Sequence, residues 1–149
     1  MMETTFHLLL YRAFHMQRSY LRPCLREIGL GSGQPKLLSY IAAHPNCRPK
    51  ALADYFEIDP AAVSRMLDVM EKSGFIVRRA DGKNRRSACL SLTEAGEEAC
   101  RSWRAHCQRE DAVMLRGFTE EERACFADFL VRAYRNLQDA QREETACGK

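Results

Sequence analysis

Residues 49–96 read PKALADYFEIDPAAVSRMLDVMEKSGFIVRRADGKNRRSACLSLTEAG, and this stretch decides the fold. It holds two helical patterns separated by a short polar turn, and then two strand-like runs separated by a long polar segment. Pro49 opens the first helical pattern, which extends to Phe56, and Pro60 opens the second, which runs to Ser73. Proline is favoured at the first position of a helix because its φ is already helical. The stretch therefore predicts a helix, a turn and a second helix, followed by a β-hairpin.

The second of these helices carries signals at both ends and on both faces. Asp59 precedes it as a side-chain cap, and Gly74 follows it where a left-handed residue commonly ends a helix. Val63, Leu67 and Met70 recur at helical spacing and should face a core. The remaining surface is small and polar, as a helix entering the DNA major groove requires, and a long donor there can contact guanine with two hydrogen bonds. The candidate DNA-binding residues of this helix are Ala61, Ala62, Ser64, Arg65 and Asp68.

The predicted hairpin is basic. Phe75, Ile76 and Val77 form a β-prone run, and apolar residues alternate with others from Ala88 to Leu92. Between Ile76 and Leu92 there are five basic residues and one acidic residue. A narrow basic tip suits the minor groove, whose focused negative potential attracts arginine. We expect DNA contacts from Arg79, Lys83, Asn84, Arg85 and Arg86, together with Lys36 and Lys50 from the preceding helical patterns.

Long amphipathic helices are predicted at both ends of the chain. Apolar residues from Phe6 to Ile28 share one helix face, and a glycine-rich segment begins at residue 29. A second helix, capped by Ser32 or Gly33, precedes Pro49. Thr93 should cap a fifth helix that runs to about residue 116, and Thr119 with Glu122 forms a capping box for a sixth. The expected fold is mainly α with a small β-hairpin wing, and its three regions are 1–30, 31–92 and 93–149.

Composition narrows the class of protein. The 149 residues lack the run of about 18 apolar residues that a membrane span needs, and the first helix pattern is unlike a signal peptide, so we expect a cytoplasmic protein. The net charge of +3 is unevenly distributed: residues 1–92 carry 14 basic and 8 acidic residues, whereas residues 93–149 carry 9 and 12. A polyanion-binding surface should therefore lie in the first two thirds of the chain.

The region from residue 29 to residue 96 resembles the MarR family of bacterial winged helix-turn-helix regulators. The motifs that carry this resemblance are Leu52-Ala53, Val63-Ser64-Arg65, Leu67, Glu71, Gly74, Ile76, Arg78, Arg86, Leu92-Thr93 and Gly96. The resemblance implies a homodimer held by the first, fifth and sixth helices, with residues 60–73 in the major groove and residues 79–87 in the minor groove of a palindromic operator. The wing triplet departs from the family's Asp-x-Arg, because Asn84 stands in place of the acid and cannot form the charge-assisted pair with Arg86.

The regulatory signal is left open by the sequence. The family resemblance implies a response to a small molecule or to thiol oxidation, and Tyr11, His15 and Tyr40 are candidates for lining an effector pocket. Among the seven cysteines, Cys47 lies beside Arg48 and has the most electropositive local sequence, and Cys24 is a second redox candidate. The alternative is that all seven are unreactive. His106 and Glu110 have the spacing of a metal-ligand pair, but further ligands are missing, so we expect neither a metal site nor a cofactor.

Two function classes other than DNA binding fit the sequence less well. Motifs for a nucleophile elbow, a zinc protease or a phosphate-binding loop are missing, so we expect no enzymatic activity. A winged helix can also serve as a protein-interaction module without sequence-specific DNA binding. The basic wing together with Arg65 favours double-stranded DNA, and the predicted function is a transcriptional regulator, a repressor in the simplest case.

Overall fold

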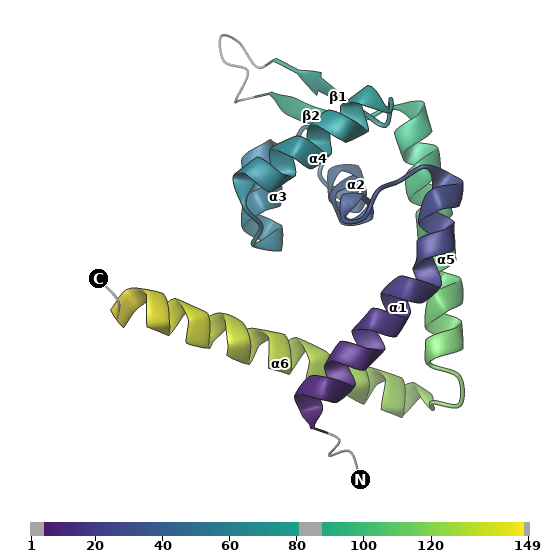
Figure 1. The fold of residues 1–149 in the computed structure, drawn as a ribbon, viewed down its shortest axis with the longest axis vertical. Helices are drawn as coiled ribbons and strands as arrows, with labels where there is room; N and C mark the ends of the chain where they lie inside the picture. The colour runs from purple at the N-terminus through teal and green to yellow at the C-terminus, as the bar shows by residue number, and fades with distance from the viewer. Residues whose placement is uncertain (1–4, 81–87, 148–149) are drawn as a thin grey trace. The chain divides into compact units, whose positions relative to one another are not determined.

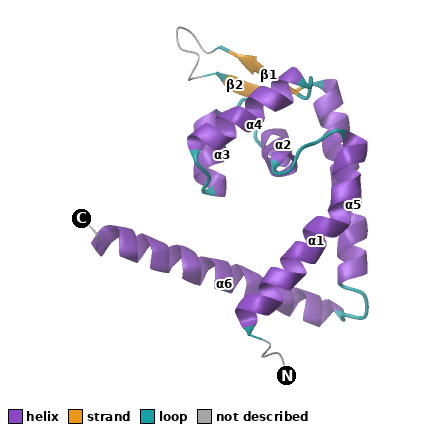
Figure 2. Cartoon of the chain, in the orientation of Figure 1, coloured by secondary structure: helices purple, strands orange, loops and turns teal. Residues whose placement is uncertain are grey.

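The computed structural model describes residues 5–80 and 88–147 and confirms a mainly α fold with one β-hairpin. The chain forms two compact units, Met1–Glu110 and Asp111–Lys149. Figure 1 shows the order of the elements. Figure 2 shows that the strands of the described chain are those of the hairpin. The elements are α1 (Phe6–Ile28), α2 (Gln34–Ala43), α3 (Pro49–Phe56), α4 (Pro60–Lys72), β1 (Ile76–Arg79), β2 (Cys89–Leu92), α5 (Glu94–Met114) and α6 (Glu120–Cys147).

The first unit has a winged-helix core. Strands β1 and β2 pair antiparallel, with Ile76 opposite Leu92 and Arg79 opposite Cys89. Helices α3 and α4 pack together, and α4 also packs against β1. Burial of apolar surface supplies the main stabilisation of such a core. Its fully buried side chains are Leu37, Leu38, Ile41, Leu52, Val63, Leu67, Met70, Ile76 and Leu90.

One strand contact was not predicted. Cys47, in the segment between α2 and α3, forms an isolated antiparallel bridge with Leu90 of β2. The Leu90 amide donates to the Cys47 carbonyl at 2.8 Å, and the Asn46 amide donates to the Leu90 carbonyl at 3.0 Å. A single bridging residue has no alternating pattern, so the sequence contains no signal for it. The bridge anchors the wing strand to the segment that leads into α3.

The predicted helix ends are confirmed at most positions. Gly29 ends α1 and Gly74 follows α4, both with positive φ, and the Asp59 carboxylate accepts a hydrogen bond from the Ala62 amide at 3.1 Å. Helix α5 ends at Met114 rather than near residue 116. The difference arises because the chain turns there into Gly117, whose φ is +86°.

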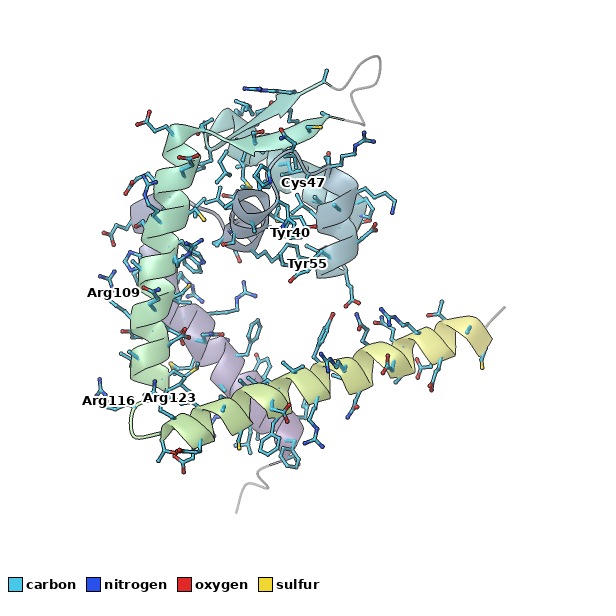
Figure 3. All side chains as sticks on the ribbon, turned by 180° about the vertical axis from the view of Figure 1, so that it is seen from behind. Tyr40, Cys47, Tyr55, Arg109, Arg116 and Arg123 are labelled. Atoms are coloured by element: carbon cyan, nitrogen blue, oxygen red, sulfur yellow. The ribbon has the colours of Figure 1, made fainter. Side chains whose placement is uncertain are left out.

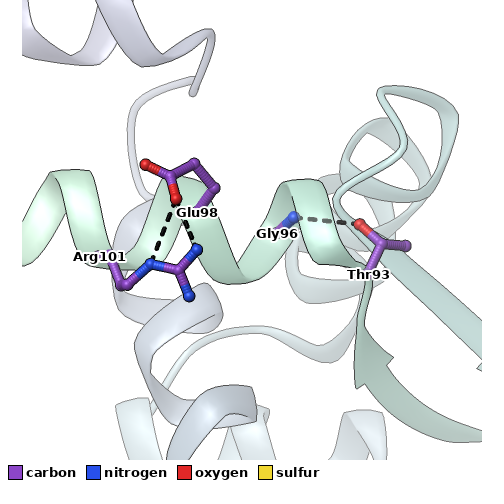
Figure 4. Close-up of polar contacts among 4 residues, drawn as sticks. All are labelled: Thr93, Gly96, Glu98 and Arg101. Atoms are coloured by element: carbon purple, nitrogen blue, oxygen red, sulfur yellow. Dashed lines mark hydrogen bonds and ion pairs between the residues drawn. The ribbon is translucent and has the colours of Figure 1, made fainter.

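The start of α5 is joined tightly to the hairpin. The Thr93 hydroxyl accepts a hydrogen bond from the Gly96 amide at 3.0 Å (Figure 4) and donates one to the Gly74 carbonyl at 2.5 Å. The Thr93 amide donates to the Phe75 carbonyl. A Cβ on Gly96 would lie 1.9 Å from that carbonyl oxygen. Only glycine therefore allows α5 to approach the hairpin this closely.

Helices α1 and α5 of the first unit are linked by polar side chains. Gln17 donates to the Glu110 carboxylate at 3.4 Å, and Glu27 lies 3.9 Å from the His106 ring. From the first of these contacts to the second, the residue number rises in α1 and falls in α5, so the two helices run antiparallel. The N-terminal half of α1 nevertheless leaves large apolar side chains exposed, among them Phe6, Leu10 and Phe14.

In the second unit, α6 begins with the predicted capping box. The Thr119 amide donates to Glu122 at 2.9 Å, and the Glu122 amide donates to the Thr119 hydroxyl at 3.2 Å. Arg123 reaches back and donates to the carbonyls of Leu115 and Phe118, which satisfies acceptors left at the end of α5. No residue of α6 is buried. A helix of this length with an apolar stripe needs a partner surface.

Across the described ranges 5–80 and 88–147, none of the helices has the length and apolar character needed to cross a membrane.

Candidate nucleic-acid interface

The outward surface of α4 is open to solvent. Its inward residues Val63, Leu67 and Met70 are buried in the core, which fixes the helix against α3 and β1. Ala61, Ser64, Arg65 and Asp68 are exposed, whereas Ala62 is half-buried and its amide is capped by Asp59. Arg65 makes no hydrogen bond or ion pair with any residue in the described part of the chain. Its guanidinium is therefore available to a partner outside the chain.

Asp68 is the exception among these residues, because it is bound by an arginine of the hairpin. Arg78 Nη2 on β1 donates to Asp68 Oδ1 at 2.6 Å, and Arg78 Nε lies 3.6 Å from a Glu71 carboxylate oxygen. The Arg78 side chain is only 26% exposed, and its Nε has no hydrogen-bond partner within the described residues. Arg78 thus links the wing to α4 and balances two carboxylates on the helix surface.

Arg78 is a motif residue of the sequence for which no contact is predicted. A basic residue in a strand gives no indication of which acid across the fold it will meet. The signal that could have found the pair is the presence of Asp68 and Glu71 three residues apart on one helix face. The geometry makes Arg78 a positioning residue between the two elements that would meet DNA.

Only part of the predicted wing can be placed. Arg79 is exposed at the end of β1. Lys83, Asn84, Arg85 and Arg86 lie outside the described residues, as does Asp81. The strands that precede and follow this segment bring Arg79 and Cys89 opposite each other. The base of the wing therefore lies beside the C-terminal half of α4, where Arg78 contacts it.

Lys36 and Lys50 are both exposed, and each has a contact within the chain. Lys36 Nζ lies 5.6 Å from the centre of the Phe56 ring, which is a cation–π arrangement. Lys50 Nζ lies 2.6 Å from the Asp54 carboxylate, one turn further along α3. An exposed pair of this kind contributes at most about 1 kcal/mol, so phosphate oxygens can replace the carboxylate as the partner of Lys50.

This arrangement of helices and hairpin matches known proteins. Residues 30–88 match the family model described as the MarR family. The fold is similar to the crystal structure of MarR, with a TM-score of 0.80 and 28% identity over 96% of this chain and 97% of that one. It is also similar to that of the transcriptional regulator SlyA, with a TM-score of 0.82 and 25% identity over 91% and 96% of the two chains. The chain belongs to the MarR family.

Relatives and a DNA complex extend this comparison. A Thauera aromatica protein proposed to regulate the hcr operon is 27% identical to this MarR-family chain, over 83% of the chain and 74% of its own length. The Bacillus subtilis regulator YybA is 27% identical over 76% and 75%. A MarR-family regulator from Listeria monocytogenes, solved in complex with a 26mer DNA, has a TM-score of 0.78 and 25% identity over 93% and 91% of the two chains.

The predicted effector residues of this MarR-family protein form two separate groups. Tyr11 and His15 stack on each other along α1, with ring centres 5.9 Å apart, and both are exposed. Tyr40 on α2 stacks on His44 and lies 4.9 Å from the ring of Tyr55 on α3 (Figure 3). No ring contact joins the two groups in residues 5–80 and 88–147. The structure of one chain does not bring the three predicted residues into one pocket.

The two redox candidates are both partly buried. Cys24 is half-buried in α1. Burial raises the pKa of the Cys47 thiol, and this outweighs the lowering effect of a backbone hydrogen bond. A redox sensor needs a lowered pKa. The basic neighbours that suggested Cys47 therefore do not dominate its environment, because its backbone is paired with β2 and its side chain packs against the core.

His106 and Glu110, which have the spacing of a metal-ligand pair, make other contacts in the structure. The Glu110 side chain is buried and bound by Gln17, and His106 Nδ1 lies 2.8 Å from an Arg109 guanidinium nitrogen. Residues 5–80 and 88–147 contain no cluster of three or more metal-ligating side chains. His106 and Glu110 serve the packing of α1 against α5.

Proposed function

We propose that this MarR-family protein is a transcriptional regulator that binds a palindromic DNA operator as a homodimer. The observation that carries the proposal is the exposed surface of α4, where Arg65 has no partner in the described chain while Arg78 balances the neighbouring acids. A cation held beside small residues on a rigid helix is what base reading in the major groove requires. The similarity to a Listeria monocytogenes protein solved with DNA supports the same function.

In this proposal, the three regions of the sequence have different roles. Residues 31–92 would contact DNA through Lys36, Lys50, the outward residues of α4 and the wing. Residues 1–30 and 93–149 would form the dimer, because α1 and α6 each expose a row of large apolar side chains. Twofold symmetry would place two α4 helices about 34–36 Å apart, one turn of DNA, and the operator would share that symmetry.

Repression relieved by a small molecule or by a redox signal is part of the proposal. A homodimer that occupies its operator blocks transcription by exclusion, and any ligand with a lower affinity for the DNA-bound conformation releases it. The protein would act in the cytoplasm on double-stranded DNA, without a cofactor and without catalysis.

The test is fluorescence anisotropy with two duplexes, one from the DNA flanking the protein's own gene and one of scrambled sequence, at several salt concentrations. Several phosphate contacts per dimer should give a steep loss of affinity with salt, and the specific duplex should bind at least ~10³-fold more tightly. Arg65→Ala should remove roughly 1–3 kcal/mol of this discrimination.

Lys72→Ala is the matched control, because Lys72 is exposed on the last turn of the same helix. It should weaken both duplexes equally, if at all. Weak and equal binding of both duplexes by the unmodified protein, across fragments covering the flanking DNA, would contradict the proposal. In that case the winged helix would serve protein interaction, and binding would depend little on salt.

A further inference from the structure

Helix α1 carries three exposed arginines whose charges no acidic side chain of the described residues balances. Arg18, Arg22 and Arg26 follow one another at intervals of four residues, so they lie along one side of the helix, and we call them the arginine row. Arg22 and Arg26 form no hydrogen bond or ion pair within residues 5–80 and 88–147. Arg18 donates to the Ser32 hydroxyl at 2.7 Å, which orients its side chain without neutralising it.

The arginine row has no acidic counterpart on its own helix. Glu27 is the single acidic residue of Phe6–Ile28, and its carboxylate lies 3.9 Å from the His106 ring of α5. Like charges four residues apart destabilise a helix, whereas opposite charges at helical spacing stabilise it, as Glu98 and Arg101 do on α5. The row therefore works against the stability of α1, and an anionic partner outside the described chain would relieve the repulsion.

Two aromatic rings extend the arginine row toward the N-terminus of α1. Tyr11 and His15 precede Arg18 by seven and three residues, which places them on the same side of the helix. Their ring centres are 5.9 Å apart and their planes differ by 15°. Tyr11 is 60% exposed, so its ring is open to stacking by a further planar group. From Tyr11 to Arg26 this side of the helix extends over about 22 Å.

This side of α1 is distinct from its apolar side. Leu10 is exposed, and Leu21, which follows it after three turns of helix, is buried in the first unit. At about 100° per residue, Arg22 lies about 120° around the helix from Leu10. A dimer contact made through the apolar side of α1 therefore does not require the arginine row.

Exposed rings in line with arginines are the features with which proteins bind single-stranded nucleic acids. The arginines neutralise phosphates, and unpaired bases stack on the rings. In a duplex the bases are stacked on one another, so their faces are not available to Tyr11 and His15. An acidic peptide would pair with the arginines and leave the rings unused. We propose that Tyr11, His15 and the arginine row bind single-stranded nucleic acid, at a surface separate from α4.

The proposal is tested by fluorescence anisotropy of the full-length protein with labelled oligothymidylate and oligouridylate of about 12 nucleotides, a length within the range of known single-strand sites. Both strands should bind saturably, and the comparison between them shows whether DNA or RNA is preferred. Three phosphate contacts should make the logarithm of the association constant fall against the logarithm of salt concentration with a slope of about −2. Absence of saturable binding by either strand at low salt would overturn the proposal.

Two further probes separate stacking from charge. A strand of the same length with abasic sites throughout keeps the phosphates and lacks the bases, and it should bind at least ten-fold more weakly than oligothymidylate. A polyglutamate peptide of equal charge should also bind at least ten-fold more weakly. Equal affinities for the abasic strand and oligothymidylate would overturn the role of the rings. Tighter binding of polyglutamate than of either strand would identify an acidic protein segment as the partner and overturn the proposal.

Three variants locate the single-strand surface. Arg22→Gln should weaken oligothymidylate binding at least five-fold and reduce the salt slope by about 0.7. Tyr11→Leu should weaken oligothymidylate binding at least five-fold and leave the affinity for the abasic strand unchanged. Arg101→Gln removes the same charge from an exposed position of α5 and should stay within two-fold of the unmodified protein. An affinity that Arg22→Gln leaves within two-fold would overturn the assignment, and circular dichroism reports whether each variant has folded.

The same measurements keep this proposal separate from duplex binding by α4. Arg65→Ala should leave the affinity for oligothymidylate within two-fold, and Arg22→Gln should leave the Kd for the specific duplex within two-fold. The reverse result, in which Arg65→Ala abolishes oligothymidylate binding and Arg22→Gln preserves it, would place single strands on α4 and overturn the proposal. A protein that binds oligothymidylate through Arg22 but discriminates no duplex would refute the proposed function and leave the α1 surface standing.

Discussion

Arg78 on β1 and Asp68 on α4 are joined by a 2.6 Å ion pair that ties the wing to the helix beside it. Asp68 is 62% exposed, so the pair should contribute no more than about 1 kcal/mol to the free energy of unfolding. Its electrostatic role is larger. Without Arg78, the carboxylates of Asp68 and Glu71 would face DNA phosphates uncompensated.

We therefore expect Arg78→Met to lower the affinity for specific and scrambled duplexes alike, by roughly ten-fold, equivalent to about 1.4 kcal/mol. Thermal melting of the variant should change little. Anisotropy at two salt concentrations measures the first effect and circular dichroism the second. Adding Asp68→Asn to the variant should recover part of the lost affinity, and an affinity unchanged by Arg78→Met would show that the pair has no role in DNA binding.

Gly96→Ala should destabilise the first unit. The new methyl group would lie 1.9 Å from the Phe75 carbonyl oxygen, so α5 or the hairpin must move. Overpacking of this kind costs about 1–3 kcal/mol. Urea unfolding followed by circular dichroism provides the measurement, with Ala95→Ser, an exposed neighbour on the same helix turn, as the control. Equal midpoints for the two variants would mean that the close approach is not required.

Cys47 should react slowly with iodoacetamide. Burial raises the pKa of its thiol, so at pH 8 a smaller fraction is thiolate than for an exposed cysteine, and the rate should rise at higher pH than usual. Mass spectrometry of peptides after timed alkylation should show Cys47 at least ten-fold slower than the exposed Cys147, with the difference lost in urea. If Cys47 were the fastest of the seven cysteines, redox sensing through it would become the leading hypothesis.

Phe129→Glu should produce monomers. Phe129 is 59% exposed on α6, and Tyr134 and Leu137 extend the same apolar surface. Burying a carboxylate in a dimer interface without a partner costs several kcal/mol. Light scattering coupled to gel filtration at micromolar concentration reports the mass, and Gln141→Glu, at an exposed position of the same helix, should remain dimeric. A dimer in both variants would place the interface elsewhere.

Local signals in the sequence predicted the elements well. Helix ends were found because caps such as Asp59 and Thr119 act on amides three residues away. The inward face of α4 was found because its three buried residues recur at helical spacing. In each case, the interaction and the pattern that reveals it lie within about two turns of one helix.

Contacts between distant segments were harder to predict. The pairing of Arg78 with Asp68 depends on how β1 crosses α4, and the bridge between Cys47 and Leu90 spans more than forty residues. For the same reason, the basic residues near Cys47 suggested a lowered pKa, whereas burial, which the sequence does not show, raises it.

The separation of the two faces of α4 has a consequence for how such a regulator could change its target. Val63, Leu67 and Met70 hold the helix in place, while Ala61, Ser64 and Arg65 have no structural task in the described chain. Substitutions at these outward positions would alter the preferred bases with little loss of stability. Asp68 is different, since replacing it also releases Arg78. If α4 reads the operator as proposed, new operator sequences would be accessible through single exchanges near the start of the helix, whereas exchanges at Asp68 would require a second change in the wing.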